Sequence, residues 1–163
     1  MGGGGKLQEI IQADFLEYEP TQQYDLVLSN GFIEHFVNYD EVLDRHMKYL
    51  KPGGAILIMI PNKRFLRKYY GLIVDRANLR AHNLKSMRIK VFRDYAIRNS
   101  LAIEKLSYYG GFAYRVHQKL NLPQKALYKV IRALSIKFNP FLESHPSPFY
   151  SGSIVAIFHK PNA

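Results

Sequence analysis

The feature that most constrains the fold is an uninterrupted apolar run at residues 55–60, which directly follows the glycine-containing segment 51–54. A strand without polar alternation is typical of a parallel strand whose two faces are both covered. Apolar residues between 42 and 50 have helical spacing, and the run from Tyr24 to Ser29 predicts an earlier strand. Strand, helix, glycine stop and strand form a βαβ unit, so we expect an α/β fold with parallel pairing.

The sequence predicts one α/β domain over residues 6–163. Apolar patterning predicts further strands at 7–12, 101–109 and 153–159 and a helix at 123–136. Residues 63–98 predict a basic helical cap or insertion, with helices at 64–80 and 85–98. Residues 1–5, a methionine and four glycines, are interpreted as a linker, a cloning remnant or a misplaced start.

The net charge of +10 is unevenly distributed along the chain. Residues 1–50 contain three basic and nine acidic side chains, whereas residues 63–98 contain eleven basic and only two acidic side chains. For individual residues a solvated helical face is the alternative, but the basic segment as a whole indicates an anionic partner: nucleic acid, a phosphorylated small molecule or an acidic membrane surface. The absence of cysteine excludes disulfides and thiolate metal sites. The longest apolar run is far below the ~20 residues that span a bilayer, so we expect a cytoplasmic protein, or one peripheral to a membrane.

Five short motifs follow one another in a characteristic order. They are Ala13-Asp14-Phe15, the strand and turn from Tyr24 to Gly31, Ile33-Glu34-His35, Leu50-Lys51-Pro52-Gly53-Gly54 and Ile60-Pro61-Asn62. The series resembles the second half of a class I S-adenosylmethionine-dependent methyltransferase over about residues 7–110, and the final strand fits that family's closing hairpin. The resemblance implies a Rossmann-like sheet, with S-adenosylmethionine lying across the carboxyl ends of its parallel strands.

The resemblance also implies a set of cofactor-binding residues. By position, Asp14 faces the adenine amino group and Phe15 the adenine ring. The loop of Ser29, Asn30 and Gly31 passes the methionine end of the cofactor and borders the substrate, and glycine lets the backbone come close. A purely structural role is the alternative for Asp14.

Glu34 and His35 are the candidate catalytic residues, because an imidazole near the methyl group could deprotonate an acceptor hydroxyl. A structural role in the loop leading into the helix is the alternative for both. In ubiquinone-pathway and small-RNA methyltransferases a Glu-x-x-Glu-His pattern binds a divalent metal, but Gly31 replaces the first Glu here, so no metal site is predicted. The candidate substrate-binding residues are Phe32, His82, Arg64 and Arg67, of which His82 could supply a second imidazole.

Two elements of that family have no counterpart in this sequence: the glycine-rich loop after strand one and the acidic residue that ends strand two. In the family's sheet order, 3-2-1-4-5-7-6, the first two βα units lie between the predicted strands 7–12 and 24–29. We therefore expect an incomplete sheet. Its edge at Tyr24 to Ser29 would be covered by residues 7–12, by a second copy in a homodimer, or by a separate N-terminal half.

The leading hypothesis is a truncated S-adenosylmethionine-dependent methyltransferase for a small or lipid-linked, anionic acceptor. On this view the parent protein is an enzyme, and this fragment is inactive alone and binds the cofactor weakly or not at all. The alternative is a non-catalytic, methyltransferase-like binding module for a partner protein, a membrane surface or nucleic acid. Nucleic acid is less favoured, because the Asn/Asp-Pro-Pro-Tyr/Phe signature and a recognisable RNA-binding motif are both missing.

Overall fold

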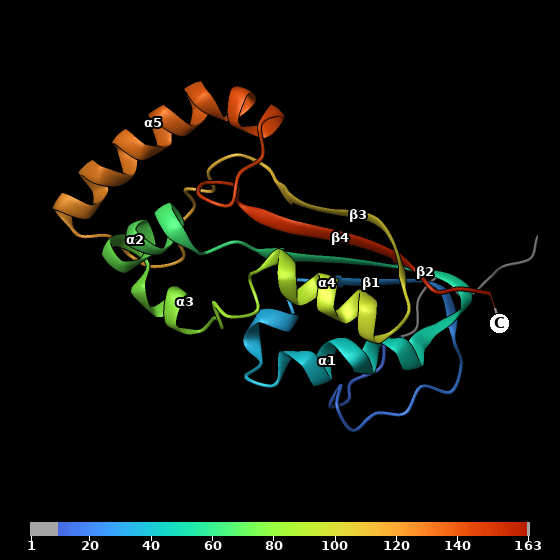
Figure 1. Ribbon diagram of the computed structural model, residues 1–163. Coiled ribbons are helices and arrows are strands. Elements are labelled where there is room, and N and C mark those ends of the chain that lie inside the picture. The colour runs from blue at the N-terminus through green and yellow to red at the C-terminus, as the bar shows by residue number, and fades with distance from the viewer. Residues whose placement is uncertain (1–9, 163) are drawn as a thin grey trace, which may run out of the picture.

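The computed structural model describes residues 10–162 as a four-stranded sheet with helices on one face and a helical extension at one end (Figure 1). The strands are β1 (Tyr24–Asn30), β2 (Leu50–Pro61), β3 (Ala102–Tyr109) and β4 (Ser153–His159). Their order, β1-β2-β4-β3, corresponds to positions 4-5-7-6 of the sheet that the sequence resemblance implies. The expected incomplete Rossmann-like sheet is confirmed.

Strands β1 and β2 run parallel, which confirms the predicted βαβ unit. The register places Ser29 of β1 beside Ile58 of β2. The connecting helix is shorter than predicted, because α1 (Tyr39–Arg45) passes into the 3-10 turn η2 (His46–Tyr49), after which β2 begins. The predicted glycine stop is therefore the first part of a strand, where Gly53 has a φ of +73°.

Helices α1 and α4 (Ile89–Arg98) cover one face of the sheet and enclose the core (Figure 1). Alternate residues of β2 point into this core, among them Ile56 and Ile58, which are fully buried. From α4, Tyr95 meets Phe158 of β4 with the ring centroids 5.6 Å apart and the rings nearly perpendicular. Burial of these large side chains is the main stabilising contribution in a domain of this size.

The opposite face of the sheet is only partly covered by residues 10–162. Leu26 and Leu28, which lie beside Ala55 and Leu57 in the sheet, are 63% and 67% exposed. The apolar run at 55–60 predicts a strand covered on both faces, and its outward residues Ala55, Leu57 and Met59 are half-buried, so this face of β2 is covered only in part. An apolar surface of this kind is typical of a site where another polypeptide packs.

The outer edge of β1 has no strand partner among residues 10–162. The predicted strand 7–12 begins outside the described residues, and it is wrong for residues 10–12, which form no strand. The chain instead makes a turn in which Asp14 Oδ1 accepts a hydrogen bond from the Leu16 N–H at 2.8 Å. An Asx turn of this type competes with extended structure.

The basic segment forms three helices rather than the two predicted. The predicted helix 64–80 is interrupted at Asp75, which separates α2 (Phe65–Val74) from α3 (Arg76–Arg80). Asp75 is buried and accepts hydrogen bonds from the Asn78 amide and from the backbone N–H and ring of His117. These donors satisfy the buried carboxylate and fix the break between the helices.

The last helix, α5 (Leu122–Ser144), is longer than predicted and lies beside α2 at one end of the molecule (Figure 1). It begins with a capping box, because the side chains of Asn121 and Gln124 each accept a hydrogen bond from the other's backbone N–H at 3.0 Å. It continues through Pro140. No helix within residues 10–162 combines the length and the apolar character needed to cross a lipid bilayer.

Replacement of Ile56 by alanine tests the position of the core. Ile56 is fully buried in β2, so Ile56→Ala is expected to lower the free energy of unfolding by about 2–5 kcal/mol in urea denaturation. The matched control, Ile97→Ala on α4, alters a side chain that is 71% exposed, and stability should change by less than about 0.5 kcal/mol. Equal losses in both variants would contradict this core.

Candidate functional site

The carboxyl end of β1 leads directly into the candidate site. Gly31 follows β1 with a φ of +62°, and its N–H donates to the Met59 carbonyl of β2 at 2.9 Å. The chain then enters the short helix η1 (Ile33–His35), which leaves the Glu34 side chain only 1% exposed. A Cβ on residue 31 would lie 3.6 Å from Oε1 of Glu34. The predicted cofactor loop and catalytic pair are therefore adjacent at the end of a parallel strand.

The link between α3 and α4 closes over η1 and brings His82 to it. The Asn83 N–H donates to the Glu34 carbonyl at 2.7 Å, and Nδ1 of His35 lies 3.1 Å from the Ala81 carbonyl oxygen. As a result, the ring centroids of His35 and His82 are 4.5 Å apart. One side-chain donor atom from each of Glu34, His35 and His82 lies within 4.8 Å of the other two.

The hydrogen bond to Ala81 defines the state of His35. A carbonyl oxygen can only accept, so Nδ1 carries a proton in this arrangement, and in the neutral imidazole the lone pair is then on Nε2. Nε2 lies 3.9 Å from Oε1 of Glu34. Burial raises the pKa of Glu34, and its Oε2 has no hydrogen-bond partner within residues 10–162. An imidazole lone pair beside a buried carboxylate is suited to accepting a proton.

Lys63 places a buried cation next to this cluster. Its Nζ donates to Oδ1 of Asn78 at 2.7 Å and lies 3.2 Å from Nδ1 of His82. Burial, together with the nearby charge of Arg67, lowers the pKa of Lys63 to about 8. Burial and the charge of Lys63 lower the pKa of His82 to about 4. At neutral pH, the site therefore combines a protonated lysine with a neutral histidine.

These side chains line a cavity of about 850 Å³ at the carboxyl ends of β1 and β2. A cavity of this size is within the usual range of ligand sites, roughly 300–1,000 Å³. Its basic lining residues are Lys63, Arg67 and Arg115. Burial lowers the pKa of Arg67 to about 10, so its guanidinium is still charged at neutral pH. Much of the remaining wall comes from Tyr109, the last residue of β3, and from the loop that follows it, residues 110–115.

Most of the predicted cofactor-binding residues lie outside this cavity. Gly31 lines it, whereas Ser29 is buried near the end of β1 and Asn30 is exposed. The Phe15 ring stacks on the ring of Tyr49 with centroids 5.4 Å apart. Asp14 lies next to Phe15 in the Asx turn, with its carboxylate exposed.

The predicted substrate-binding residues divide between two places. His82 and Arg67 line the cavity together with Glu34 and His35, the predicted catalytic pair. Phe32 instead packs edge-on against Phe15, with ring centroids 5.1 Å apart. Arg64 lines a separate basic cleft beside α2.

The sequence interpretation did not single out Lys63, Asn78 or Arg115 as site residues. Lys63 lies two residues after the end of β2. Because ligands in α/β sheets bind at the carboxyl ends of such strands, this position in the sequence could have identified Lys63 as a site residue. Asn78 and Arg115 carry no comparable signal, because one lies on α3 and the other on a loop far along the chain. They reach the cavity only through the tertiary fold.

The cluster fits a divalent metal only in part. One carboxylate and two imidazoles form a donor set that such ions accept, and Oε2 of Glu34 is free of hydrogen bonds within the described residues. However, Gly31 leaves the position of a further ligand without a side chain. The Lys63 ammonium also lies within 3.2 Å of His82 and opposes a second positive charge. The donor set is therefore incomplete, and these residues suit proton transfer better.

Comparisons with known proteins support the same fold family. Residues 6–115 match the family model described as a methyltransferase domain. A mitochondrial ubiquinone biosynthesis O-methyltransferase from Dictyostelium discoideum is 43% identical over 72 residues, which is 37% of this chain and 22% of that protein. A SAM-dependent methyltransferase from Archaeoglobus fulgidus has a TM-score of 0.56 and 18% identity, over 92% of this chain and 66% of that one.

A phosphoethanolamine N-methyltransferase from Haemonchus contortus, solved with S-adenosyl-L-methionine, has a TM-score of 0.54 and 16% identity over 91% of this chain and 36% of its own. At such identities these structures show the fold alone. The chain spans less than two-thirds of the Archaeoglobus protein and about a fifth of the Dictyostelium protein. Because the family model covers more than half of the chain and the sheet has the 4-5-7-6 order, the chain belongs to the class I S-adenosylmethionine-dependent methyltransferase family.

Proposed function

We propose that the cavity is the methyl-transfer site of an enzyme that acts on a hydroxyl group of a small or lipid-linked, anionic acceptor. The observation that carries this proposal is the grouping of Glu34, His35 and His82 beside the buried Lys63. Groups that can take up a proton lie next to a cation that can hold an anion. The grouping lies at the carboxyl ends of β1 and β2, where ligands bind in this class of sheet.

Each side chain has a defined part in the proposed reaction. Nε2 of His35 accepts the proton of the acceptor hydroxyl, and the carboxylate of Glu34 stabilises the imidazolium that forms. Lys63 and Arg67 hold the anionic group of the acceptor and orient its hydroxyl. When bound, S-adenosylmethionine supplies a methyl group on a positively charged sulfur, whose carbon–sulfur bond breaks as the carbon–oxygen bond forms.

The catalytic role is tested in a hybrid protein, in which residues 6–163 follow the N-terminal half of the Archaeoglobus fulgidus methyltransferase. The hybrid is expected to bind S-adenosylhomocysteine and to methylate phosphate-bearing phenols. His35→Ala should lower kcat by about 10²–10⁴ with no change in the Kd for S-adenosylhomocysteine.

The matched control is His145→Ala, because His145 is exposed at the end of α5 and is not among the residues that line the cavity. It should leave kcat unchanged. A folded hybrid that binds no S-adenosylhomocysteine would exclude the cavity as the methyl-transfer site. Full kcat in His35→Ala would exclude His35 as the base.

We further propose that a polypeptide carrying the glycine-rich loop covers the edge of β1 in the active protein. The support is the exposed, apolar surface of Leu26 and Leu28 beside an edge without a strand partner in residues 10–162. Residues 1–163 alone are then expected to bind S-adenosylmethionine weakly or not at all in isothermal titration calorimetry. Micromolar binding by this chain would refute that expectation.

The same exposed edge favours the second candidate function, a non-catalytic module that binds a partner through β-strand addition. The two functions differ in what an added N-terminal half does. If it restores cofactor binding, the chain is part of an enzyme. If a hybrid folds without cofactor binding while the chain alone captures a partner along β1, the binding module is the better description.

Divalent metals test the proton-transfer assignment of the cluster. Within the described residues the site offers only three donor atoms, and the Lys63 ammonium lies close to His82. We therefore expect Mg²⁺, Mn²⁺ and Zn²⁺ to leave the thermal unfolding midpoint of this chain unchanged. Chelation by EDTA should have no effect either. A metal-dependent rise that disappears in both Glu34→Gln and His82→Ala would instead establish a metal centre.

The pKa of His82 predicts how stability depends on pH. Burial and Lys63 lower this pKa from 6.5 to about 4 in the folded state, so the unfolded chain binds more protons between those values. Stability should therefore fall as the pH falls from about 6.5 to about 4. Because His82 is only partly buried, we expect its share to be on the order of 1 kcal/mol. His82→Gln should reduce the slope measured by urea denaturation, and an unchanged slope would contradict a depressed pKa.

A further inference from the structure

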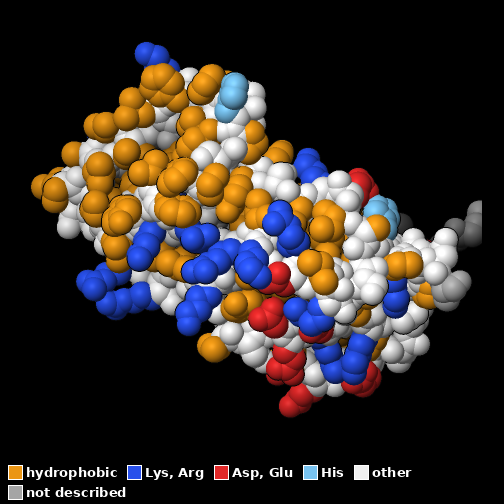
Figure 2. Space-filling model, viewed as in Figure 1, with side chains coloured by type: hydrophobic (Ala, Val, Ile, Leu, Met, Phe, Trp, Pro, Cys, Tyr) orange, Lys and Arg blue, Asp and Glu red, His pale blue; other side chains and the backbone are white. Residues whose placement is uncertain are grey.

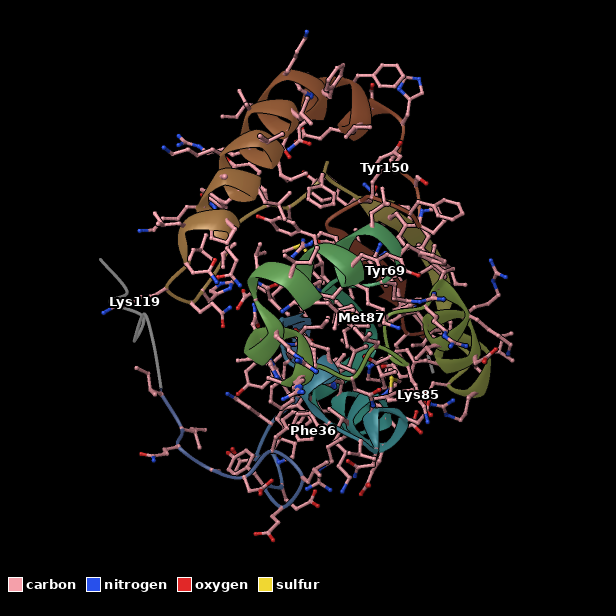
Figure 3. All side chains as sticks on the ribbon, turned by 90° about the vertical axis from the view of Figure 1, so that its left-hand side faces the viewer. Phe36, Tyr69, Lys85, Met87, Lys119 and Tyr150 are labelled. Carbon is pink, nitrogen blue, oxygen red and sulfur yellow. The ribbon has the colours of Figure 1, made fainter. Side chains whose placement is uncertain are left out.

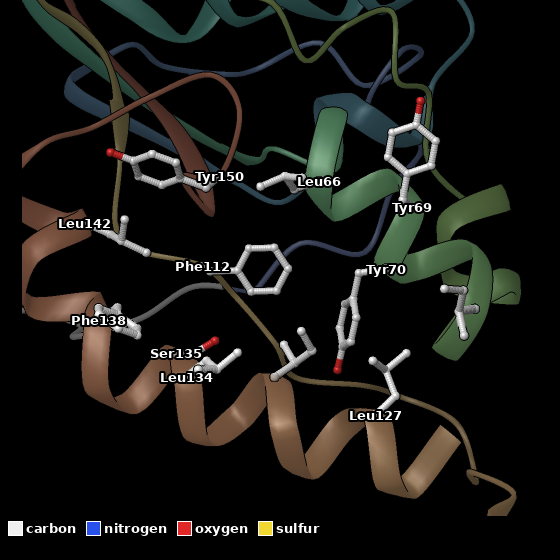
Figure 4. Close-up of a pocket in the computed structure, with 12 residues that line it drawn as sticks. Leu66, Tyr69, Tyr70, Phe112, Leu127, Leu134, Ser135, Phe138, Leu142 and Tyr150 are labelled. Atoms are coloured by element: carbon white, nitrogen blue, oxygen red, sulfur yellow. The ribbon is translucent and has the colours of Figure 1, made fainter. Parts of the chain in front are cut away.

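The end of the molecule formed by α2 and α5 contains an apolar groove of about 430 Å³ (Figure 4). Phe112 and Tyr70 lie between the two helices, and Leu66 and Phe138 line the groove from either helix. Apart from the tyrosine hydroxyls, Ser135 is the polar residue of the lining. Its size and lining fit alkyl chains or apolar side chains.

Helix α5 is fixed at both ends and leaves the groove open between them. Near its start, the Gln124 side chain donates to the Ile73 carbonyl of α2 at 2.6 Å. Near its end, Asn139 exchanges two hydrogen bonds with the backbone of Phe112, at 2.9 and 3.2 Å. Gly111 permits this contact, because a Cβ there would lie 2.5 Å from the Asn139 side chain. The groove is thus a built feature of the fold.

The apolar surface continues outside the groove. Figure 2 shows hydrophobic side chains gathered over this end of the molecule, with a band of Lys and Arg side chains along their border. The large, exposed apolar side chains of α2 and α5 are Leu66, Tyr69, Leu72, Ile73, Leu122, Val130, Leu134, Ile136, Phe138 and Phe141. Soluble proteins rarely expose apolar patches of this extent, and such a patch marks an interaction site.

A basic cleft of about 300 Å³ adjoins the groove and shares Tyr69 with it. Its charged lining residues are Arg64, Lys68, Lys85 and Arg88, none of which forms an ion pair within residues 10–162. Figure 3 views the molecule from this end, where α5 lies above α2 and the labels Tyr69 and Lys85 mark the cleft. A cleft that the described residues line with four cations and no carboxylate is suited to binding a phosphate group.

We propose that this end of the molecule docks on a membrane surface that contains anionic phospholipids. The apolar side chains of α2 and α5 enter the boundary between headgroups and acyl chains, and the basic cleft holds a lipid phosphate. A membrane supplies apolar chains and negative charge side by side, in the same arrangement as the groove and the cleft. A second copy of the chain is the poorer fit, because it would bring two basic clefts together.

Vesicle flotation tests this proposal without any enzymatic readout. Residues 1–163 are expected to float with vesicles of phosphatidylcholine and phosphatidylglycerol, and to bind vesicles of phosphatidylcholine alone far more weakly. High salt should weaken binding, because it screens the attraction of the cations. Lys68→Gln with Arg88→Gln should weaken binding about 30-fold, since each cation near an anionic surface contributes a factor of about five.

Matched pairs of variants separate docking from general effects. Arg93→Gln with Lys105→Gln removes the same charge outside the cleft and should weaken binding much less. Leu66→Ser with Phe138→Ser should weaken binding at least about tenfold. Val37→Ser with Ile97→Ser, which alters exposed apolar residues elsewhere, should leave binding unchanged.

Two results would overturn the proposal. One is that the folded chain binds both kinds of vesicle equally well, or binds neither. The other is a dimer, detected by light scattering, that Leu66→Ser with Phe138→Ser converts to a monomer, because a second copy would then cover the groove. If Leu66→Ser with Phe138→Ser fails to fold, loss of vesicle binding in Lys68→Gln with Arg88→Gln still supports the proposal.

Discussion

The parallel pairing of β1 with β2 determines where the candidate site and the helical insertion lie. It places the carboxyl ends of both strands at one edge, so that Gly31 and Lys63 emerge there together. The hydrogen bond from the Gly31 N–H to the Met59 carbonyl continues the ladder beyond β1. Without this pairing, neither η1 nor the start of the helical insertion would reach the cavity.

A second contact completes the site and comes from the insertion itself. The link between α3 and α4 donates the Asn83 N–H to the Glu34 carbonyl, and His82 thereby comes to lie against His35. The insertion therefore has two faces with different chemistry. One face closes the cavity with a buried lysine and a neutral histidine. The other carries the basic cleft and forms one wall of the apolar groove, whose second wall comes from α5.

The fold could be predicted from the sequence where the pattern is local. The βαβ unit and the strands β3 and β4 follow from apolar periodicity and glycine placement, and the position of Glu34 and His35 at the end of β1 follows from the motif order. The break at Asp75 could not be predicted, because it depends on His117 in a distant loop. The depressed pKa of Lys63 likewise depends on tertiary burial, and the exposed face of β1 contradicts what its apolar residues indicate locally.

Nuclear magnetic resonance of the histidine rings can show whether the fold joins η1 and the α3–α4 link into one site. We expect a nuclear Overhauser effect between the ring protons of His35 and His82, whose ring centroids are 4.5 Å apart. We also expect His82 to stay neutral until the pH approaches about 4. The absence of that effect, with His82 titrating at its ordinary pKa of 6.5, would show that the two segments do not form one site.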